Sequence, residues 1–415
     1  MHRLTCGMPL LIMENHDVAV ATADVWVRTG GADEPARLLG VSHFLEHMLF
    51  KGTERFGLGE IERAIENLGG VCNAGTSFDF THYYVTIPAG SIGVAIQMLA
   101  EMVRHSTLDP TELEKERLVI LEEYRRKQDH PVGVLFEKLY SEAFEAGPYH
   151  DPVIGYEETI RAIDRDGMLD YYRKRYSPGS AALVVVGDVD PAAVIEEAEA
   201  AFAGFDRPLT ALIEEAPQSF GAGKRVHVKK PTGGEVYVTF SIPAPGMSDP
   251  DRAVVLDVAQ CIVGQGRASR LYQSLKEKRQ LCSSIGCHYP SHLRGSLVVV
   301  VATCRPEQRD ELRAALFEEL REFAAEPCDD RVLERALRLL GSAHRFSMET
   351  TGGAAGNIGS YFTLTGTPDF LDGYLEMLAT VTAGEVRAAV NDLVDPAQLE
   401  KLMIEVSVGP NGAAA

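Results

Sequence analysis

The order of strand-like and helix-like segments in the first part of the chain begins again in the second part. Residues 25–50, VWVRTGGADEPARLLGVSHFLEHMLF, contain a β-rich run, a turn with a Glu-Pro step and an apolar helical run. Residues 236–264, VYVTFSIPAPGMSDPDRAVVLDVAQCIVG, repeat this order with an Asp-Pro step. Between the two copies, residues 206–224 mix proline, glycine and acidic residues without a steady period, which is typical of a linker. We therefore expect two related domains, 1–205 and 225–415, joined by this linker.

The local patterns indicate which kind of domain is duplicated. Strand-like runs occupy residues 18–28, 82–88, 181–191 and 297–304, and helical runs occupy residues 59–70, 91–106 and 109–130. Strands interleaved with helices in this way favour an α+β fold, with two α/β sandwich domains, over a regular parallel βαβ arrangement. The glycine-rich run TGGAAGNIGS at residues 351–360 predicts a flexible loop.

The composition argues against several classes of partner. The chain of 415 residues is 45% hydrophobic and 24% charged, as in ordinary globular proteins, and its formal net charge is −20. Nucleic acid and anionic membranes attract basic surfaces, so neither is expected as a partner. No run approaches the roughly 18 apolar residues of a membrane helix, and the N-terminus lacks a secretory signal pattern. The seven cysteines form no Cys-x-x-Cys pair, which predicts free thiols and a cytoplasmic protein, with unconventional export left open.

The segment HFLEH places two histidines four residues apart on a helical run. His43 and His47 then share one helix face, and Glu46 lies beside them. Imidazoles in this arrangement can bind one zinc ion, and a nearby carboxylate can take a proton from a water that attacks a carbonyl. The same spacing also suits two histidines packed on an apolar face. A second pair, HYPSH at residues 288–292, contains Pro290 and no glutamate, which argues against a helical metal site there. Spacing alone leaves both interpretations of HFLEH open.

A zinc site of this kind needs a third ligand, and the acidic helix expected at residues 109–130 is one place to look. Glu116 and Glu123 are seven residues apart and share a helix face, whereas Glu122 points about 100° away from Glu123. Acidic helices are more often solvated than metal-binding. Periodicity therefore does not select this helix.

Three runs in this order, HFLEHMLFKGT, VCNAGTSFDFTHYY and ELEKERLVILEEYRRK, resemble the M16 family of zinc peptidases. This family of inverzincins includes insulin-degrading enzymes, pitrilysin and the mitochondrial processing peptidases. The length and the two-part organisation are similar to its short-chain branch, M16B. The resemblance implies that His43, His47 and Glu123 bind one Zn²⁺ per chain, that Glu46 is the catalytic base, and that Glu116 is an accessory acid.

The resemblance also implies a binding site for the peptide substrate. The run NAGTS at residues 73–77 is similar to the edge strand on which the family lays its substrate in an extended form. Asn73, Ala74 and Thr76 would then bind the substrate, with backbone groups pairing as in β-augmentation. From composition alone, NAGTS predicts a loop.

One part of the family pattern is missing. Family members that complete their own active site have an arginine and a tyrosine, seven apart, in the second half of the chain. In the corresponding run SRLYQSLKEKRQLCSSIG, Lys276 stands at the arginine position and Ser283 at the tyrosine position. A lysine lacks the planar fork of arginine, and a serine is too short to replace a phenol. Arg279 or Tyr289 could act in their place.

The sequence therefore predicts a zinc-dependent metalloendopeptidase that hydrolyses short or unfolded peptides inside an enclosed chamber. We expect the chain to be the zinc-bearing subunit of a heterodimer. A homologous partner that lacks HxxEH would supply the arginine and the tyrosine, and the two chains would form halves of a clamshell. Two alternatives stay open: a self-sufficient homodimeric peptidase in which Lys276 replaces the arginine, and a non-catalytic subunit like the core proteins of respiratory complexes.

Overall fold

The fold consists of two compact units, seen in a computed structural model that describes residues 1–208, 219–325, 328–393 and 398–410. Unit 1 is built from residues 1–124, 151–215 and 345–371, and unit 2 from residues 125–150, 216–344 and 372–415. The unit boundaries therefore do not follow the expected division at residues 206–224 alone. Much of that expected linker, residues 209–218, lies outside the described residues.

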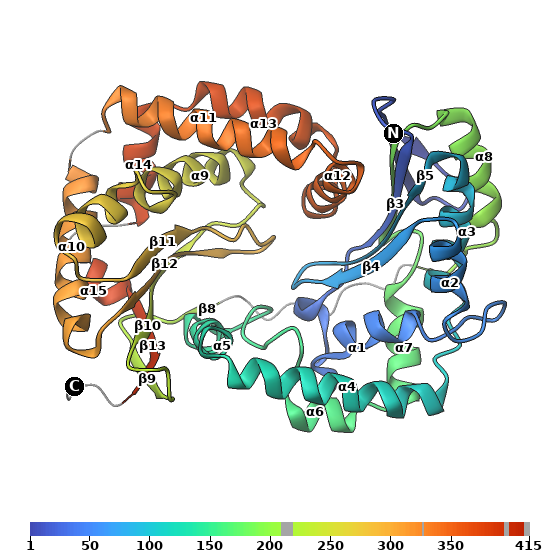
Figure 1. Cartoon of the computed structure of the whole chain (residues 1–415), viewed down its shortest axis with the longest axis horizontal. Helices are drawn as coiled ribbons and strands as arrows, with labels where there is room; N and C mark the ends of the chain where they lie inside the picture. Colours follow the sequence, from blue (N-terminus) through green and yellow to red (C-terminus); the bar gives the residue numbers. More distant parts are fainter. Residues whose placement is uncertain (209–218, 326–327, 394–397, 411–415) are drawn as a thin grey trace. The chain divides into compact units, whose positions relative to one another are not determined.

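Unit 1 is organised around a six-stranded sheet with the order β1-β2-β7-β3-β5-β4, of which Figure 1 labels β3, β4 and β5. Its strands are β1 His2–Arg3, β2 Pro9–Glu14, β3 Val20–Val27, β4 Val71–Thr76, β5 Thr81–Pro88 and β7 Ala181–Gly187. The helices of this unit include α1 Val41–Leu49, α2 Glu60–Asn67, α3 Ile92–His105, α6 Glu157–Ala162, α7 Arg165–Arg175 and α8 Pro191–Ala201. The central strand β7 is buried along its whole length, because both faces of the sheet are covered. This explains its continuous apolar sequence.

Unit 2 repeats the topology of unit 1. Its five-stranded sheet has the order β11-β12-β10-β13-β9, with β9 Arg225–Lys229, β10 Val236–Ala244, β11 Ser284–His288, β12 Ser296–Cys304 and β13 Ile404–Gly409. The pair β9–β13 is parallel and the other three pairs are antiparallel. In unit 1 the strands β4-β5-β3-β7-β2 correspond in this order to β11-β12-β10-β13-β9, again with one parallel pair, β2–β7. The expected duplication is thus confirmed at the level of sheet topology.

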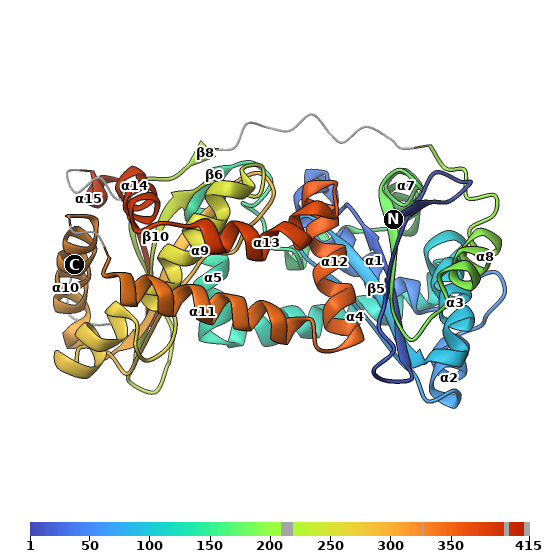
Figure 2. The same ribbon diagram turned by 90° about the horizontal axis from the view of Figure 1, so that it is seen from above.

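Each unit also takes a helix from the part of the sequence that mainly forms the other unit. The long helix α4 Pro110–Asp129 leads into α5 Pro131–Ala143, which packs on β10 and β13 of unit 2. In the second copy, α11 Asp330–Ser347 leads into α12 Thr351–Thr365, which packs on β3 and β7 of unit 1. Figure 2 shows α11 and α12 in succession. Because β3 and β7 correspond to β10 and β13, the two exchanges are equivalent.

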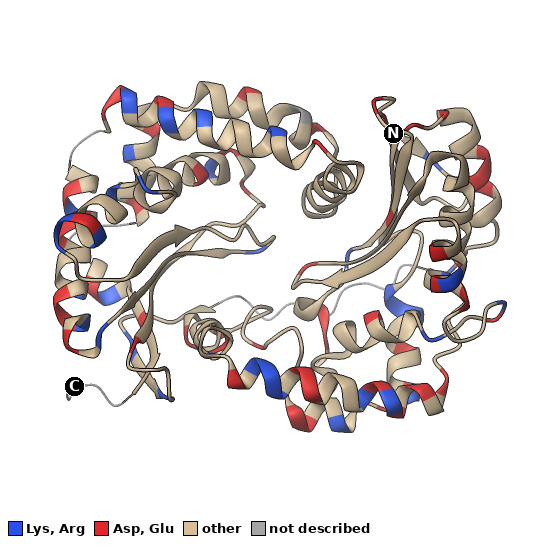
Figure 3. Cartoon of the chain, viewed as in Figure 1, with Lys and Arg blue, Asp and Glu red and all other residues tan. Residues whose placement is uncertain are grey.

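Helix α12 corrects the expectation of a flexible loop at residues 351–360. The helix has no charged side chain and is drawn without blue or red in Figure 3. Its glycines let the backbone come close to the sheet, and a Cβ on Gly359 would lie only 2.0 Å from Nε1 of Trp26. At its first turn, the hydroxyl of Thr351 lies 2.9 Å from that of Thr22 on β3. Of the glycines that suggested a loop, Gly359 is thus required by close helix–sheet packing, whereas a Cβ on Gly356 would meet no atom within 4 Å.

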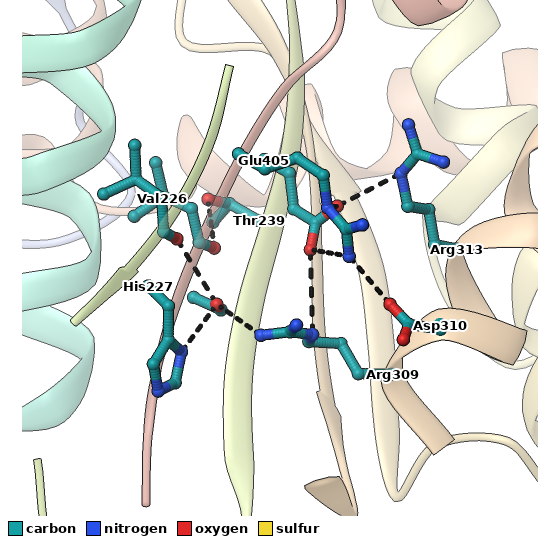
Figure 4. Close-up of polar contacts among 10 residues, drawn as sticks. Val226, His227, Thr239, Arg309, Asp310, Arg313 and Glu405 are labelled. Carbon is teal, nitrogen blue, oxygen red and sulfur yellow. Dashed lines mark hydrogen bonds and ion pairs between the residues drawn. The ribbon is translucent and has the colours of Figure 1, made fainter. Parts of the chain in front are cut away.

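A buried carboxylate joins the sheet of unit 2 to α10 Arg309–Ala325 (Figure 4). Glu405 on β13 is only 2% exposed. It forms ion pairs with Arg225 at 2.9 Å and Arg313 at 3.2 Å, and its other oxygen lies 3.9 Å from Nε of Arg309. Arg225 also pairs with Asp310 at 2.7 Å. The network therefore links β9, β13 and the beginning of α10.

The fold also contains four further helices and a separate two-stranded sheet. They are α9 Pro250–Gly264, α13 Asp369–Thr380, α14 Ala383–Leu393 and α15 Leu399–Leu402, with the short two-stranded pair β6 Phe144–Ala146 and β8 Ser219–Phe220. All seven cysteines are free thiols. None of the helices in the described part of the chain is long and apolar enough to cross a bilayer.

Candidate metal centre and active site

The beginning of α1 is fixed by a glycine and a capping carboxylate. Gly40 has a φ of 94°, and a Cβ at this position would lie 2.5 Å from the carbonyl oxygen of Ile154. The carboxylate of Glu34 accepts hydrogen bonds from the backbone amides of Gly40 at 2.5 Å and Ser42 at 2.6 Å. These bonds satisfy amides that a helix N-terminus leaves without an intrahelical partner. The first turn that leads to the histidines is thereby held in place.

The two faces of α1 differ in burial. Its apolar residues Val41, Phe44, Leu45, Met48 and Leu49 are completely buried in the core of unit 1. His43, Glu46 and His47 are only partly buried. The apolar residues therefore anchor the helix, and the HxxEH side chains remain accessible for chemistry. The packed-face interpretation of the two histidines does not describe their environment.

Three expected metal ligands come together in unit 1. One ligand atom from each of His43, His47 and Glu123 lies within 4.8 Å of the others, and Oε2 of Glu123 is 3.7 Å from Nε2 of each histidine. A tetrahedral zinc ion with bonds of about 2.0–2.2 Å separates its donor atoms by roughly 3.4 Å. The donor set of two imidazoles and one carboxylate also suits zinc. In the described residues, this is the one group of three such side chains found within that distance.

The acidic helix α4 supplies the carboxylate because Glu116 and Glu123 both lie on the face of α4 that is turned toward α1. Its beginning is capped by Asp109, whose Oδ1 accepts hydrogen bonds from the amides of Thr111 and Glu112. Glu122 is exposed and is not part of the metal group.

Glu116 contacts His47 from the side opposite the metal group. Its Oε1 lies 2.9 Å from Nδ1 of His47, and its Oε2 forms an ion pair with Nζ of Lys51 at 2.7 Å. Burial alone would raise the pKa of Glu116, but the hydrogen bonds from Lys51 and His47 lower it below its usual value. A carboxylate can only accept, so Nδ1 of His47 donates and the lone pair of Nε2 is left facing Glu123.

Glu46 lies between the metal group and the edge strand β4. Its Oε2 accepts a hydrogen bond of 2.6 Å from the hydroxyl of Thr76. Burial raises the pKa of Glu46, whereas the bond from Thr76 and the nearby imidazole of His47 lower it. A fixed carboxylate with a raised pKa beside a potential metal-bound water is suited to general acid–base chemistry.

The NAGTS run forms most of β4, and β4 is an outer strand of the sheet. Strand β5 pairs with one side of β4, and among the residues that the structure describes no strand pairs with the other side. On this strand the side-chain oxygen of Asn73 accepts a hydrogen bond of 2.9 Å from the amide of Ala74. The loop predicted from composition is therefore wrong. Of the three expected substrate-binding residues, Thr76 directs its hydroxyl toward Glu46.

The residues at the expected Arg and Tyr positions belong to unit 2. Lys276 lies in the π-helical turn η4 Tyr272–Lys278, with its ammonium 4.9 Å from the centre of the Tyr272 ring. Ser283 precedes β11 and donates to Oε1 of Glu235 at 3.1 Å. Of the two possible substitutes, Arg279 pairs with Glu318 at 2.7 Å, and Tyr289 is buried and donates to the carbonyl of Pro245 at 2.6 Å. Both substitutes already have partners within unit 2.

The second histidine pair does not form a helical site. His288 is the last residue of strand β11. Nε2 of His292 lies 2.8 Å from the hydroxyl of Tyr140 on α5. The argument from Pro290 against a helix is therefore confirmed.

Sequence reasoning missed two features near the site. Lys51 follows His47 by four residues, so helical spacing could have placed it near the same carboxylate. The pair formed by His82 on β5 and Asp24 on β3 had no comparable signal, because the two residues are 58 positions apart. Only the register of the sheet brings them together.

The chain is similar to several known proteins. Residues 10–157 match the family model described as insulinase, peptidase family M16, and residues 162–340 match the peptidase M16 inactive domain. An uncharacterized zinc protease of Streptomyces coelicolor is 29% identical over 397 residues, which cover 94% of this chain and 85% of the relative. The uncharacterized zinc protease YmxG of Bacillus subtilis is 26% identical over 393 residues, which cover 94% and 95%. The crystal structure of a protease from Helicobacter pylori has the same fold, with a TM-score of 0.89, 23% identity and coverage of 99% and 98%.

Proposed function

Because the chain belongs to peptidase family M16, we propose that it is a zinc-dependent endopeptidase that hydrolyses short or unfolded peptides. The observation that carries this proposal is the meeting of His43, His47 and Glu123 within 4.8 Å, with Glu46 on the same helix as the two histidines. Two relatives are named as zinc proteases, which supports the same assignment. We infer one Zn²⁺ per chain, because the group supplies one set of three ligands and leaves room for a fourth.

The protein residues around the site have distinct roles in this proposal. When bound, zinc supplies a Lewis acid that polarises a peptide carbonyl and lowers the pKa of a water molecule. Glu46 accepts the proton of the attacking water and delivers it to the nitrogen of the leaving amine. Thr76 keeps the Glu46 carboxylate oriented through its 2.6 Å hydrogen bond. Glu116 orients the imidazole of His47 and increases its basicity.

The substrate is proposed to bind in an extended form along the outer side of β4. An added strand would satisfy backbone groups that the sheet leaves unpaired, as in β-augmentation. The Asn73 side chain occupies the amide of Ala74, so it would have to rotate away as the peptide pairs with the strand. A folded protein offers few free backbone groups of this kind. The binding mode therefore favours short or unfolded peptides.

We further propose that the catalytic site is completed by a homologous partner chain, with the substrate enclosed between the two chains. Lys276 stacks near Tyr272 and Ser283 bonds to Glu235 within unit 2, and a serine cannot supply a phenol to the developing oxyanion. The loss of one oxyanion donor typically lowers the rate about 100- to 1000-fold. A partner with the arginine and the tyrosine, and without HxxEH, would restore this group.

Purification of the native assembly tests both parts of the proposal. The assembly should contain about one zinc per copy of this chain, and a quenched unfolded peptide should be cleaved. Removal of zinc by a chelator should abolish cleavage, and added zinc should restore it. A zinc-free assembly that cleaves no peptide would contradict the peptidase assignment. If the active assembly contains only copies of this chain, the heterodimer is wrong and the homodimer replaces it.

A further inference from the structure

The two faces of β4 lead to different surroundings. Thr76 points toward the HxxEH helix, as its bond to Glu46 shows. Side chains alternate along a strand, so Gly75 belongs to the opposite face. In the register of β4 and β5, Gly75 is paired with His82, and directly paired residues share one face of the sheet. The face opposite the metal group therefore presents His82 next to a position that has no side chain.

His82 is held in place by a buried carboxylate and by aromatic rings. Its Nδ1 lies 3.1 and 3.2 Å from the two oxygens of Asp24, whose side chain is only 3% exposed. The imidazole stacks on Trp26 with ring centres 4.2 Å apart and on Tyr84 with ring centres 5.5 Å apart. Its side chain still has 19% of its surface exposed. The Asp24 carboxylate and the two neighbouring aromatic rings therefore fix the position and orientation of the imidazole.

The remaining ring nitrogen is directed toward Gly75. A Cβ on Gly75 would lie 3.1 Å from Nε2 of His82, which is a tighter contact than most real Cβ atoms make. The glycine therefore leaves space beside Nε2 that a larger residue would narrow. A peptide strand beside β4 would place its own residue about 5 Å from Gly75. A long side chain from that residue can reach Nε2.

We propose that His82 and Asp24 form a specificity subsite for a lysine or arginine side chain of the substrate, namely the residue paired opposite Gly75. This inference rests on the proposed peptide binding along β4. In the tautomer whose Nδ1 donates to the Asp24 carboxylate, Nε2 is the acceptor. An ammonium or guanidinium donates to that nitrogen and is also attracted by the negative charge of Asp24. An acidic side chain meets neither a donor nor a positive charge there.

Peptide binding to the Glu46→Gln protein tests the subsite without relying on cleavage. A fluorescent ten-residue peptide of uncharged residues is varied by placing one lysine at each position in turn. A matched series has norleucine, which has a similar length and no donor. At one position, lysine should bind about 10-fold more tightly than norleucine, as expected for a partly exposed hydrogen bond to a charged group. The second substitution His82→Phe keeps a ring between Trp26 and Tyr84 and should remove this preference, and His82→Gln should restore part of it.

The outcomes separate this inference from the proposed function. The control Tyr84→Phe keeps the neighbouring ring and should retain the preference for lysine. If both peptide series bind but no position shows a lysine preference that depends on His82, the subsite is wrong and peptide binding stands. If no peptide of either series binds, both the subsite and the proposed peptide site are contradicted.

Discussion

Replacement of Glu116 by glutamine removes a negative charge next to His47 and leaves the side chain almost the same size. In the parent protein, one oxygen of Glu116 bonds to Nδ1 of His47 at 2.9 Å and the other pairs with Lys51 at 2.7 Å. A carboxamide has one acceptor and one donor end, so it cannot accept from both partners. Either Lys51 or His47 then faces an NH₂ group. The imidazole loses part of its orientation and its basicity.

The expected effect is a weaker affinity for zinc with little change in folding. Residues that orient a metal-binding histidine typically contribute 10- to 100-fold to metal affinity, or about 1.4–2.7 kcal/mol. Glu116 is only 8% exposed, so solvent screens its contact with His47 weakly. We therefore expect the Kd for zinc to rise by about 30-fold. Competition with a chromophoric chelator on zinc-free protein measures this value, and thermal unfolding without zinc checks the fold.

The control is the same change at Glu122, which lies on the same helix. Glu122 is exposed and does not belong to the metal group, so Glu122→Gln should leave the Kd for zinc unchanged. Two results would refute the reasoning. Glu116→Gln could bind zinc as tightly as the parent, or the two variants could lose affinity equally.

Three further predictions concern the packing and charge of the fold. Gly359→Ala should lower the free energy of unfolding by about 1–3 kcal/mol, because its Cβ would meet Trp26 at 2.0 Å; Gly356→Ala, at an open position of the same helix, should be neutral or stabilising in the same denaturant titration. Glu405→Gln should cost about 3 kcal/mol, since it leaves arginines without their buried carboxylate, and an unchanged denaturation midpoint would show that the network contributes nothing. Burial lowers the pKa of His292 to about 4. As the pH falls, the histidine therefore takes up a proton in the unfolded chain before it does so in the folded chain. Folding loses no stability through this group above about pH 6.5, and it loses stability as the pH falls from there toward 4. The parent should therefore lose more stability over that range than His292→Gln, and parallel pH profiles would contradict this.

The parts of the site that lie on helices could be predicted from the sequence because helical spacing is regular. Residues four or seven positions apart lie on the same face of a helix, which applies to His43 with His47 and to Glu116 with Glu123. That α1 and α4 would meet could not be derived from spacing, because periodicity within a helix does not show which other helix it packs against. The resemblance to a family selected the helix. The structure then brings the ligand atoms together as the resemblance implied.

The features that could not be predicted depend on contacts between segments that are far apart in the sequence. Gly359 looked like a loop residue, although its lack of a side chain serves close packing against Trp26. The NAGTS run has few β-formers, and residues 73–76 become part of a strand because β5 pairs with them. The exchange of α5 and α12 between units could not be predicted either, since neither helix sequence indicates which sheet the helix packs on. The contact between His82 and Asp24 likewise exists only through the register of β3 and β5.

The central claim is that Glu46 acts as the base of a zinc-dependent peptidase. The most direct measurement is the rate of cleavage of a quenched unfolded peptide by the zinc-loaded native assembly, compared with the same assembly carrying Glu46→Gln. Loss of a general base should lower kcat about 100- to 10,000-fold, while zinc content and peptide binding stay close to those of the parent. Cleavage by the variant at the rate of the parent, with zinc bound, would contradict the account.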